Sequence, residues 1–204
     1  GVIPRCELRG GVAQCAFDCI EGTFDADGLA NNGCELTPDP EAIYVTTSEN
    51  GGVDGNDCGD FVRPCATIAV GQQRATAANR GRIRVAEGVY REGVVLRNGL
   101  EVLGGHQRTT WERNGLLFPT VVQGSTEIDI HYATVVARDI DQPTVFDGFV
   151  VRAESPLFDG NSYGIYVVNA GPELSITNNS ILAGNGGRGR DGDAGGSGDA
   201  GSIG

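Results

Sequence analysis

Short apolar runs, separated by Gly, Asn and Pro, follow one another along most of the chain between residues 43 and 182. Runs that are rich in β-branched residues and bounded by turn-forming residues predict short β-strands. We expect these strands at 43–47, 83–86, 94–97, 100–103, 120–122, 134–137, 145–152, 165–168 and 174–177. Because no helical pattern lies between the strands after Ile83, a doubly wound α/β fold is excluded. The sequence predicts an all-β fold, for which a β-sandwich is one arrangement.

One helix is predicted at residues 66–79, where the sequence ATIAVGQQRATAAN is rich in Ala. Pro64 precedes it, and proline suits the start of a helix because its missing N–H would have no partner there. Asn79 and Gly81 form a C-terminal signal. We expect this helix to cover an open end of the strand array.

The stretch 164–182, GIYVVNAGPELSITNNSIL, holds short apolar runs that are followed by Asn169, Asn178 and Asn179. Asn tolerates left-handed backbone, so it can turn a corner in one residue. The stretch resembles the coils of right-handed parallel β-helix proteins, the pectin-lyase-like superfamily, in which such Asn residues lie at corners. IYVTT at 43–47 and GRIRVAEGVYREGVVLRNGLEVLGG at 81–105 resemble the beginning of bacterial surface proteins of this kind.

The resemblance implies a right-handed parallel β-helix, a solenoid, with an N-terminal capping helix and a disulfide-rich N-terminal extension. CAFDCIEGTFDADGLANNGCE at 15–35 is similar to Cys- and Asp-rich modules of surface proteins in myxobacteria and related bacteria. We therefore divide the chain into a loop-rich, disulfide-stapled module at 1–40, a β-helix at 41–185 and a tail at 186–204.

Six cysteines lie in the first third of the chain: Cys6, Cys15, Cys19, Cys34, Cys58 and Cys65. An even number predicts three disulfides in an oxidising compartment. A zinc site is the alternative for Cys15 and Cys19, although no second close Cys or His pair follows them. The local pair Cys58–Cys65 is the best supported, and we assign Cys6–Cys15 and Cys19–Cys34 to the others, although the sequence allows several pairings.

Two acidic loops are candidate calcium sites, because Ca²⁺ takes six to eight oxygen ligands from such segments. The candidate ligands are Asp25, Asp27, Asn31, Asn32 and Glu35 in the first loop, and Asp54, Asp57 and Asp60 in the second. A turn rich in Asp and Asn explains the first set equally. Calcium is the one cofactor that the sequence suggests.

A third candidate site is the segment TEIDIHY, in which Glu127, Asp129 and His131 alternate with apolar residues. A single strand would place the two carboxylates and the imidazole on one face. Such a set can bind a metal or perform acid–base chemistry. A solvated face of a half-buried strand is the interpretation that we prefer.

The tail carries Gly at every third position from Gly186 to Gly204. This period is typical of collagen, but the other positions contain no Pro. Extended strands that pack side by side and a flexible Gly-rich linker are the two alternatives.

The 204-residue chain has a net charge of −12 and a pI of about 4.5. This balance argues against nucleic acid and anionic membranes as partners. No run approaches the roughly 18 apolar residues of a membrane helix. Gly1 is consistent with a mature N-terminus after removal of a signal peptide, so we expect an extracellular or outer cell-surface location.

The residues do not define a catalytic site: no Gly-x-Ser-x-Gly and no paired Asp-Asp run occur. We predict a secreted or cell-surface structural protein that acts in adhesion, surface coating or fibre assembly. Its expected partners are further copies or further coils of the same polypeptide, with polysaccharide as another option. The resemblance also leaves open an enzyme, a polysaccharide lyase or glycoside hydrolase whose active site lies partly outside this chain.

Overall fold

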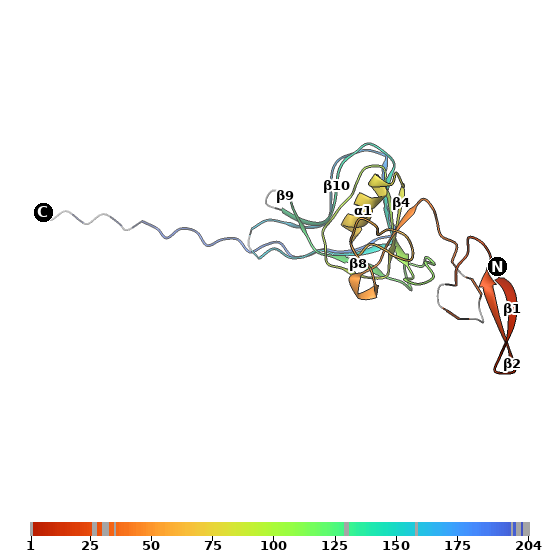
Figure 1. Cartoon of the computed structure of the whole chain (residues 1–204). Coiled ribbons are helices and arrows are strands. Elements are labelled where there is room, and N and C mark those ends of the chain that lie inside the picture. The colour runs from red at the N-terminus through yellow and green to blue at the C-terminus, as the bar shows by residue number, and fades with distance from the viewer. Residues whose placement is uncertain are drawn as a thin grey trace.

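The structure is a computed structural model that describes residues 2–25, 28–29, 33–34, 36–128, 131–157, 159–196, 198 and 201. The described residues form a mainly β body, with a separate hairpin at one end and an extended C-terminal segment at the other (Figure 1). The expected all-β composition is thus confirmed at the level of secondary structure.

The hairpin consists of β1 (Val2–Arg9) and β2 (Val12–Cys19), which pair antiparallel along their whole length. Gly10 and Gly11 join them with φ angles of 62° and 81°. Positive φ at both positions is the geometry of a tight two-residue hairpin turn. The expectation that residues 1–40 are loop-rich is therefore wrong for residues 2–19.

A five-stranded parallel sheet forms the centre of the body, in the order β14-β11-β7-β4-β3. Its strands are β3 (Ala42–Val45), β4 (Arg82–Ala86), β7 (Glu101–His106), β11 (Thr144–Asp147) and β14 (Leu174–Thr177). Matching register positions carry one apolar row across this sheet: Ile43, Ile83, Val102, Phe146 and Ile176. This row faces the core of the protein.

Two four-stranded sheets flank the central sheet. The first is parallel, in the order β15-β12-β8-β5, and contains β5 (Gly88–Tyr90), β8 (Thr120–Gln123), β12 (Phe149–Arg152) and β15 (Ser180–Leu182). The second is mixed and contains β6 (Val94–Val95), β9 (Thr126–Ile128), β10 (His131–Ile140) and β13 (Ser162–Ala170). In the mixed sheet β9 runs antiparallel to β10.

The prediction of a right-handed parallel β-helix is wrong. The described strands are divided among an antiparallel hairpin, a mixed sheet and two parallel sheets, and they do not form a solenoid. Two features disturb the regular repeat that a solenoid requires. Unequal lengths of chain separate the neighbours Ile43, Ile83 and Val102 on the central sheet, and the antiparallel strand β9 interrupts the parallel pattern.

The predicted helix is confirmed as α1 (Ile68–Ala77), preceded in the chain by the short 3-10 helix η1 (Ser48–Asn50). Thr67 is its N-cap, and the Thr67 hydroxyl accepts a hydrogen bond from the N–H of Val70. The helix thus begins later than Pro64. Gly71 allows close packing on β3, because a Cβ at Gly71 would lie 2.5 Å from Cγ2 of Val45.

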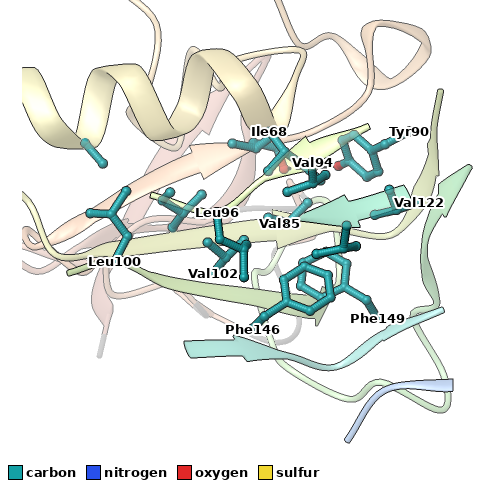
Figure 2. Packing of buried hydrophobic residues seen from close by; sticks show 14 of the residues in the cluster. Ile68, Val85, Tyr90, Val94, Leu96, Leu100, Val102, Val122, Phe146 and Phe149 are labelled. Carbon is teal, nitrogen blue, oxygen red and sulfur yellow. Dashed lines mark hydrogen bonds between the residues drawn. The ribbon is translucent and has the colours of Figure 1, made fainter. Parts of the chain in front are cut away.

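The main core cluster extends from Ile68 on α1 to Phe146 and Phe149, whose rings stack with centroids 4.3 Å apart (Figure 2). Val85, Val102 and Val122 are fully buried between these ends. Each sheet contributes to this cluster, so the three sheets and the helix share one interior.

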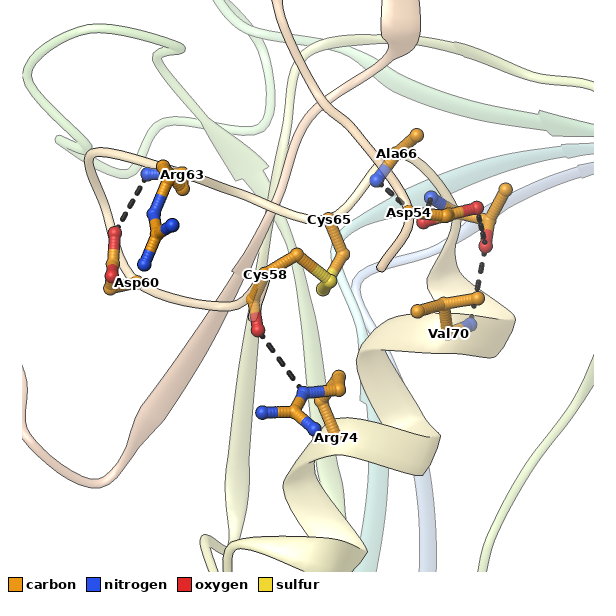
Figure 3. The surroundings of a disulfide bond; sticks show 9 residues. Asp54, Cys58, Asp60, Arg63, Cys65, Ala66, Val70 and Arg74 are labelled. Atoms are coloured by element: carbon orange, nitrogen blue, oxygen red, sulfur yellow. Dashed lines mark hydrogen bonds between the residues drawn. A yellow bond between two sulfur atoms is a disulfide. The ribbon is translucent and has the colours of Figure 1, made fainter. Parts of the chain in front are cut away.

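All three predicted disulfides are present, Cys6–Cys15, Cys19–Cys34 and Cys58–Cys65. Among the described residues no cysteine is free. Cys58–Cys65 closes a loop beside α1, where Arg74 Nε donates a hydrogen bond to the carbonyl of Cys58 at 3.2 Å (Figure 3).

Candidate functional site

The first predicted calcium loop is described only in part. Asp25 lies in an exposed turn, where Oδ1 accepts a hydrogen bond from the N–H of Gly28 at 2.7 Å. The other four candidate ligands, Asp27, Asn31, Asn32 and Glu35, lie outside the described residues. The calcium prediction at this loop stays a prediction.

In the second predicted calcium loop, the carboxylates bind groups at the start of α1 and groups of the loop that the Cys58–Cys65 disulfide closes. Asp54 accepts hydrogen bonds from the N–H groups of Ala66 and Thr67 and from the Thr67 hydroxyl (Figure 3). Asp57 pairs with Arg63, and Asp60 accepts from the backbone of the same arginine and of Val62. Each carboxylate is therefore engaged in a different local contact.

A second carboxylate reaches the start of α1 from a distant turn. Glu92 accepts hydrogen bonds from the N–H groups of Ile68 at 2.8 Å and Ala69 at 3.0 Å. Burial raises the pKa of this carboxyl, the two N–H groups lower it, and the charge of Asp54 raises it further, so that its pKa lies above the usual value. Glu92 thus links the turn before β6 to α1, because the free N–H groups of a helix start favour a negative charge.

The third predicted site is divided between two strands. Glu127 belongs to β9 and His131 begins β10, so the single strand expected at 127–131 is wrong. Asp129 lies outside the described residues. His131 Nδ1 accepts from the N–H of Asn161 at 3.4 Å, and its ring contacts Tyr163 edge-on. Within the described part of the chain no group of three His, Cys, Asp or Glu side chains is arranged to hold a metal ion.

The corner beside β11 is a network around Asp147, whose side chain is 8% exposed. Arg113 pairs with this carboxylate, and Thr177 and Asn178 donate hydrogen bonds to it. Burial opposes the charged form, but the hydrogen bonds from Thr177, Arg113 and Asn178 outweigh it and lower the pKa of Asp147. A cavity of about 560 Å³ borders this network.

A second polar network covers the central sheet. Asp39 pairs with Arg82 at 2.7 Å and Arg84 at 3.0 Å, and Arg82 also pairs with Glu101 at 2.8 Å. His106 lies nearby, 3% exposed, and its Nδ1 has no hydrogen-bond partner among the described residues. The sequence interpretation missed both networks, because their members are isolated charges that are far apart in the chain.

The most distinctive surface feature of the described residues is an open edge formed by three consecutive strands. β13, β14 and β15 follow one another in the chain, yet each is the last strand of a different sheet. No described segment forms a strand pair with their outer edges. We call this surface the open edge, defined by residues 162–170, 174–177 and 180–182.

Backbone groups on the open edge point away from the body. The carbonyls of Glu173 and Thr177 accept hydrogen bonds from β11 and the residue after it. Since backbone groups alternate in direction along a strand, the N–H and C=O of Ile176 point outward. The carbonyl of Leu182 bonds to Ala153 beside β12, so the backbone groups of Ile181 point outward as well.

The side chains of the open edge are uncharged and in part exposed. None of its strands, SYGIYVVNA, LSIT and SIL, contains Asp, Glu, Arg or His. Val167 is 48% exposed, and Ile181 and Leu182 are each 51% exposed. Natural proteins usually protect an edge strand with charge, proline or a covering segment. The described residues provide none of these on the open edge.

On the opposite side of the body, other segments lie against β3, β6 and β5. The N–H and C=O of Tyr44 on β3 bond to Gly59 and Cys65 of the disulfide loop. The side chain of Gln72 on α1 bonds to the carbonyl of Val95 and the N–H of Arg97 beside β6. Gly88 on β5 lies so close to Thr47 that a Cβ there would be 2.7 Å from the threonine methyl group. The body therefore has one open side, and an opposite side on which the edges of β3 and β6 are covered.

No family model, no curated protein and no solved structure matches the chain in comparisons with known proteins. No matched relative supports the resemblance to pectin-lyase-like surface proteins. The three disulfides are compatible with an oxidising, extracellular compartment. None of the helices within the described residues is long and apolar enough to cross a membrane.

Proposed function

We propose that the protein is a self-associating structural component outside the cell, serving adhesion, surface coating or fibre assembly. The observation that carries this proposal is the uncharged open edge of β13, β14 and β15. Unpaired edge strands with apolar side chains beside them are a template for pairing with another chain. On a chain with a net charge of −12, an uncharged surface is also where two copies repel each other least.

The side of the body opposite the open edge determines how two copies can meet. A head-to-tail contact of all three sheets would require free edges on β3, β5 and β6, and the edges of β3 and β6 are covered. The open edge of one copy therefore pairs with the open edge of a second copy, β14 against β14 in antiparallel orientation. Such a contact is isologous and closes as a pair.

A carbohydrate-active enzyme has less support from the same residues. Asp147 is the one carboxylate among the described residues that line the cavity of about 560 Å³. Three side chains hold it in its charged form, and its pKa is lowered. A general acid needs the opposite, a pKa raised towards the working pH. Asp147 is accordingly a structural ion pair in this proposal.

Sedimentation velocity over a wide range of protein concentrations tests the proposal. Ile181→Lys introduces a charge at the open edge, and because Ile181 is half exposed, the lysine ammonium can reach solvent without unfolding the body. We expect the sedimentation coefficient of the wild type to rise with concentration, and this rise to weaken in the variant. Ser180→Lys, on an exposed side chain of the same strand, is the second variant.

Val62→Lys is the matched control, because Val62 is 71% exposed on the disulfide loop, away from the open edge. It should associate like the wild type. A wild-type protein that stays monomeric at every concentration, or one that cleaves a polysaccharide as a monomer, would contradict the proposed function.

A further inference from the structure

The hairpin of β1 and β2 has one apolar face and one polar face. Cross-strand pairs place Val2 with Cys19, Pro4 with Phe17, Cys6 with Cys15 and Leu8 with Ala13. Since side chains alternate between the two faces of a strand, these eight residues share one face. We call this surface the apolar face of the hairpin. The opposite face carries Ile3, Arg5, Glu7, Val12, Gln14, Ala16 and Asp18.

Most of the apolar face is exposed. Leu8 is 76% exposed and Val2 is 44% exposed, and Pro4, Cys6, Ala13 and Cys15 are exposed as well. An isolated two-stranded hairpin is marginally stable in water and gains stability from packing against another element. The Cys6–Cys15 disulfide links the two strands on this face, and both cysteines are exposed. The hairpin therefore presents an exposed apolar sheet face.

The charges of the hairpin favour a second copy as that partner. Its formal charges balance, Arg5 and Arg9 against Glu7 and Asp18, whereas the whole chain carries −12. Arg5 also pairs with both Glu7 at 3.1 Å and Asp18 at 3.6 Å within the hairpin. Two hairpins can therefore approach without the repulsion that the net charge of the chain imposes elsewhere.

We infer that the apolar face of the hairpin packs against the same face of a second copy. The two hairpins would form two stacked two-stranded sheets, with Leu8, Pro4 and Phe17 of each copy in the shared interior. Packing of two apolar sheet faces is the arrangement by which small sheets exclude water. The contact relates identical surfaces, so it is isologous and by itself produces a dimer.

The position of the hairpin in the molecule determines how this contact would extend an assembly of several copies. Figure 1 shows the hairpin at the end of the molecule opposite the extended C-terminal segment, beyond the body that carries the open edge. Two different isologous contacts on one molecule alternate along a string of copies, and the string stays open when the two two-fold axes do not meet. The string, though not the hairpin contact itself, rests on the proposed function.

Two single variants and their combination separate the two contacts. Leu8→Lys places a charge on the apolar face of the hairpin, and Ile181→Lys places one on the open edge. We expect long assemblies from the wild type, dimers from either single variant and monomers from the double variant. Light scattering after size-exclusion chromatography and electron microscopy measure these states.

Val12→Lys is the matched control for the hairpin, because Val12 is 64% exposed on the opposite face, next to the same turn. It should assemble like the wild type. Ala13→Lys, at the residue paired with Leu8, should repeat the effect of Leu8→Lys and so guards against a local folding defect. Retention of the Cys6–Cys15 disulfide by peptide mapping reports that the hairpin is intact.

Each failure points to one contact. Leu8→Lys and Ala13→Lys proteins that assemble like the wild type would overturn the hairpin contact and leave the open edge in place. An Ile181→Lys protein that still forms long assemblies would overturn the open-edge contact and leave the hairpin contact. Equal loss of assembly with Val12→Lys would show that charge alone, and not the apolar face, controls the association.

Discussion

Asn169 Nδ2 donates a hydrogen bond to Oδ1 of Asp139 at 2.9 Å, and both residues have left-handed backbone, with φ angles of 50° and 54°. Ala170 is the register partner of Ile140, so the two corners lie directly beside each other at the ends of β13 and β10. The prediction that Asn residues adopt left-handed backbone is confirmed at Asn169 and at Asn178, whose φ angle is 54°, but is wrong for Asn179.

Asn169→Ala should destabilise the protein by about 1–2 kcal/mol, because an alanine pays the steric cost of the left-handed region and cannot replace the hydrogen bond. Asn169→Gly keeps the backbone accessible and loses only the exposed hydrogen bond, so its effect should be smaller. Urea unfolding of the two variants measures the difference. Equal effects of Ala and Gly would contradict the role of the backbone conformation.

Gly71→Ala should lower the free energy of unfolding by about 1–3 kcal/mol, although alanine is the better helix former. The new Cβ would lie 2.5 Å from Cγ2 of Val45, so α1 must move away from β3. Val45→Ala removes the clashing methyl groups, and the double variant should recover part of the packing loss. Purely additive effects in this double-mutant cycle would argue against the contact.

His106 should make the stability depend on pH between about 6.5 and 4. Burial lowers the pKa of its imidazole, and the charges of Arg84 and Arg113 lower it further, to about 4, while the carbonyls of Val85 and Leu103 act in the opposite direction. The unfolded chain binds the proton first as pH falls. Stability is therefore lost as pH falls from about 6.5 towards 4, by up to about 3 kcal/mol.

His106→Gln should remove this part of the pH dependence, which denaturant unfolding at a series of pH values measures. The raised pKa of Glu92 has the opposite effect on stability, because burial of its charge lowers the free energy of unfolding as pH rises. The pH dependence of the wild type is therefore the net result of the Glu92 and His106 contributions. Comparison with the variant isolates the histidine. His131→Gln, at the other histidine, is the matched control. If the free energy of unfolding of His106→Gln depended on pH as in the wild type, the prediction would be wrong.

Replacement of Cys58 and Cys65 by alanine should cost about 2–3 kcal/mol, since the disulfide closes a short loop. The same loop covers the edge of β3, so the N–H groups of Tyr44 and Thr46, which bond to Gly59 and Cys65, should exchange faster with solvent. Hydrogen exchange followed by mass spectrometry measures this. Alanine at Cys6 and Cys15 is the comparison, and there the faster exchange should be confined to the hairpin.

The sequence predicted the local structure of the body better than its arrangement. Alternating β-branched residues and turn residues located most strands, because that pattern depends on neighbours in the chain. The single strand predicted at 145–152 is two strands, since Gly148, with a φ angle of 83°, turns the chain between β11 and β12. Which strands share a sheet depends on contacts between distant segments, and the predicted solenoid failed at that level.

The hairpin was missed although its signal is in the sequence. Two Gly residues at 10–11 stand between runs that alternate apolar and polar residues, which is a strong hairpin pattern. Residues 1–40 were interpreted as loop-rich because little apolar periodicity was recognised in them. Pairing Cys6 with Cys15 places both on one face of the hairpin, so the disulfide and the alternation are consistent with each other.

Acidic residues in the sequence were the weakest guide to the position of a functional site. Asp54 and Asp60 satisfy backbone N–H groups, which is the use that turns and helix starts make of a carboxylate. A calcium loop requires the same residue types at similar spacing, so composition alone cannot separate the two uses. Asp39 and Asp147 anchor arginines that are far away in the chain, and no local pattern marks such pairs.

The Cys6–Cys15 disulfide connects assembly to the redox state of the surroundings. In a reducing compartment Cys6 and Cys15 would remain thiols, and no covalent bond would join the two strands of the hairpin. An isolated two-stranded hairpin is only marginally stable in water. The apolar face would then be lost as a defined surface. Closure of the disulfide under oxidising conditions would create the contact surface of the hairpin, so assembly beyond the open-edge pair would depend on oxidation.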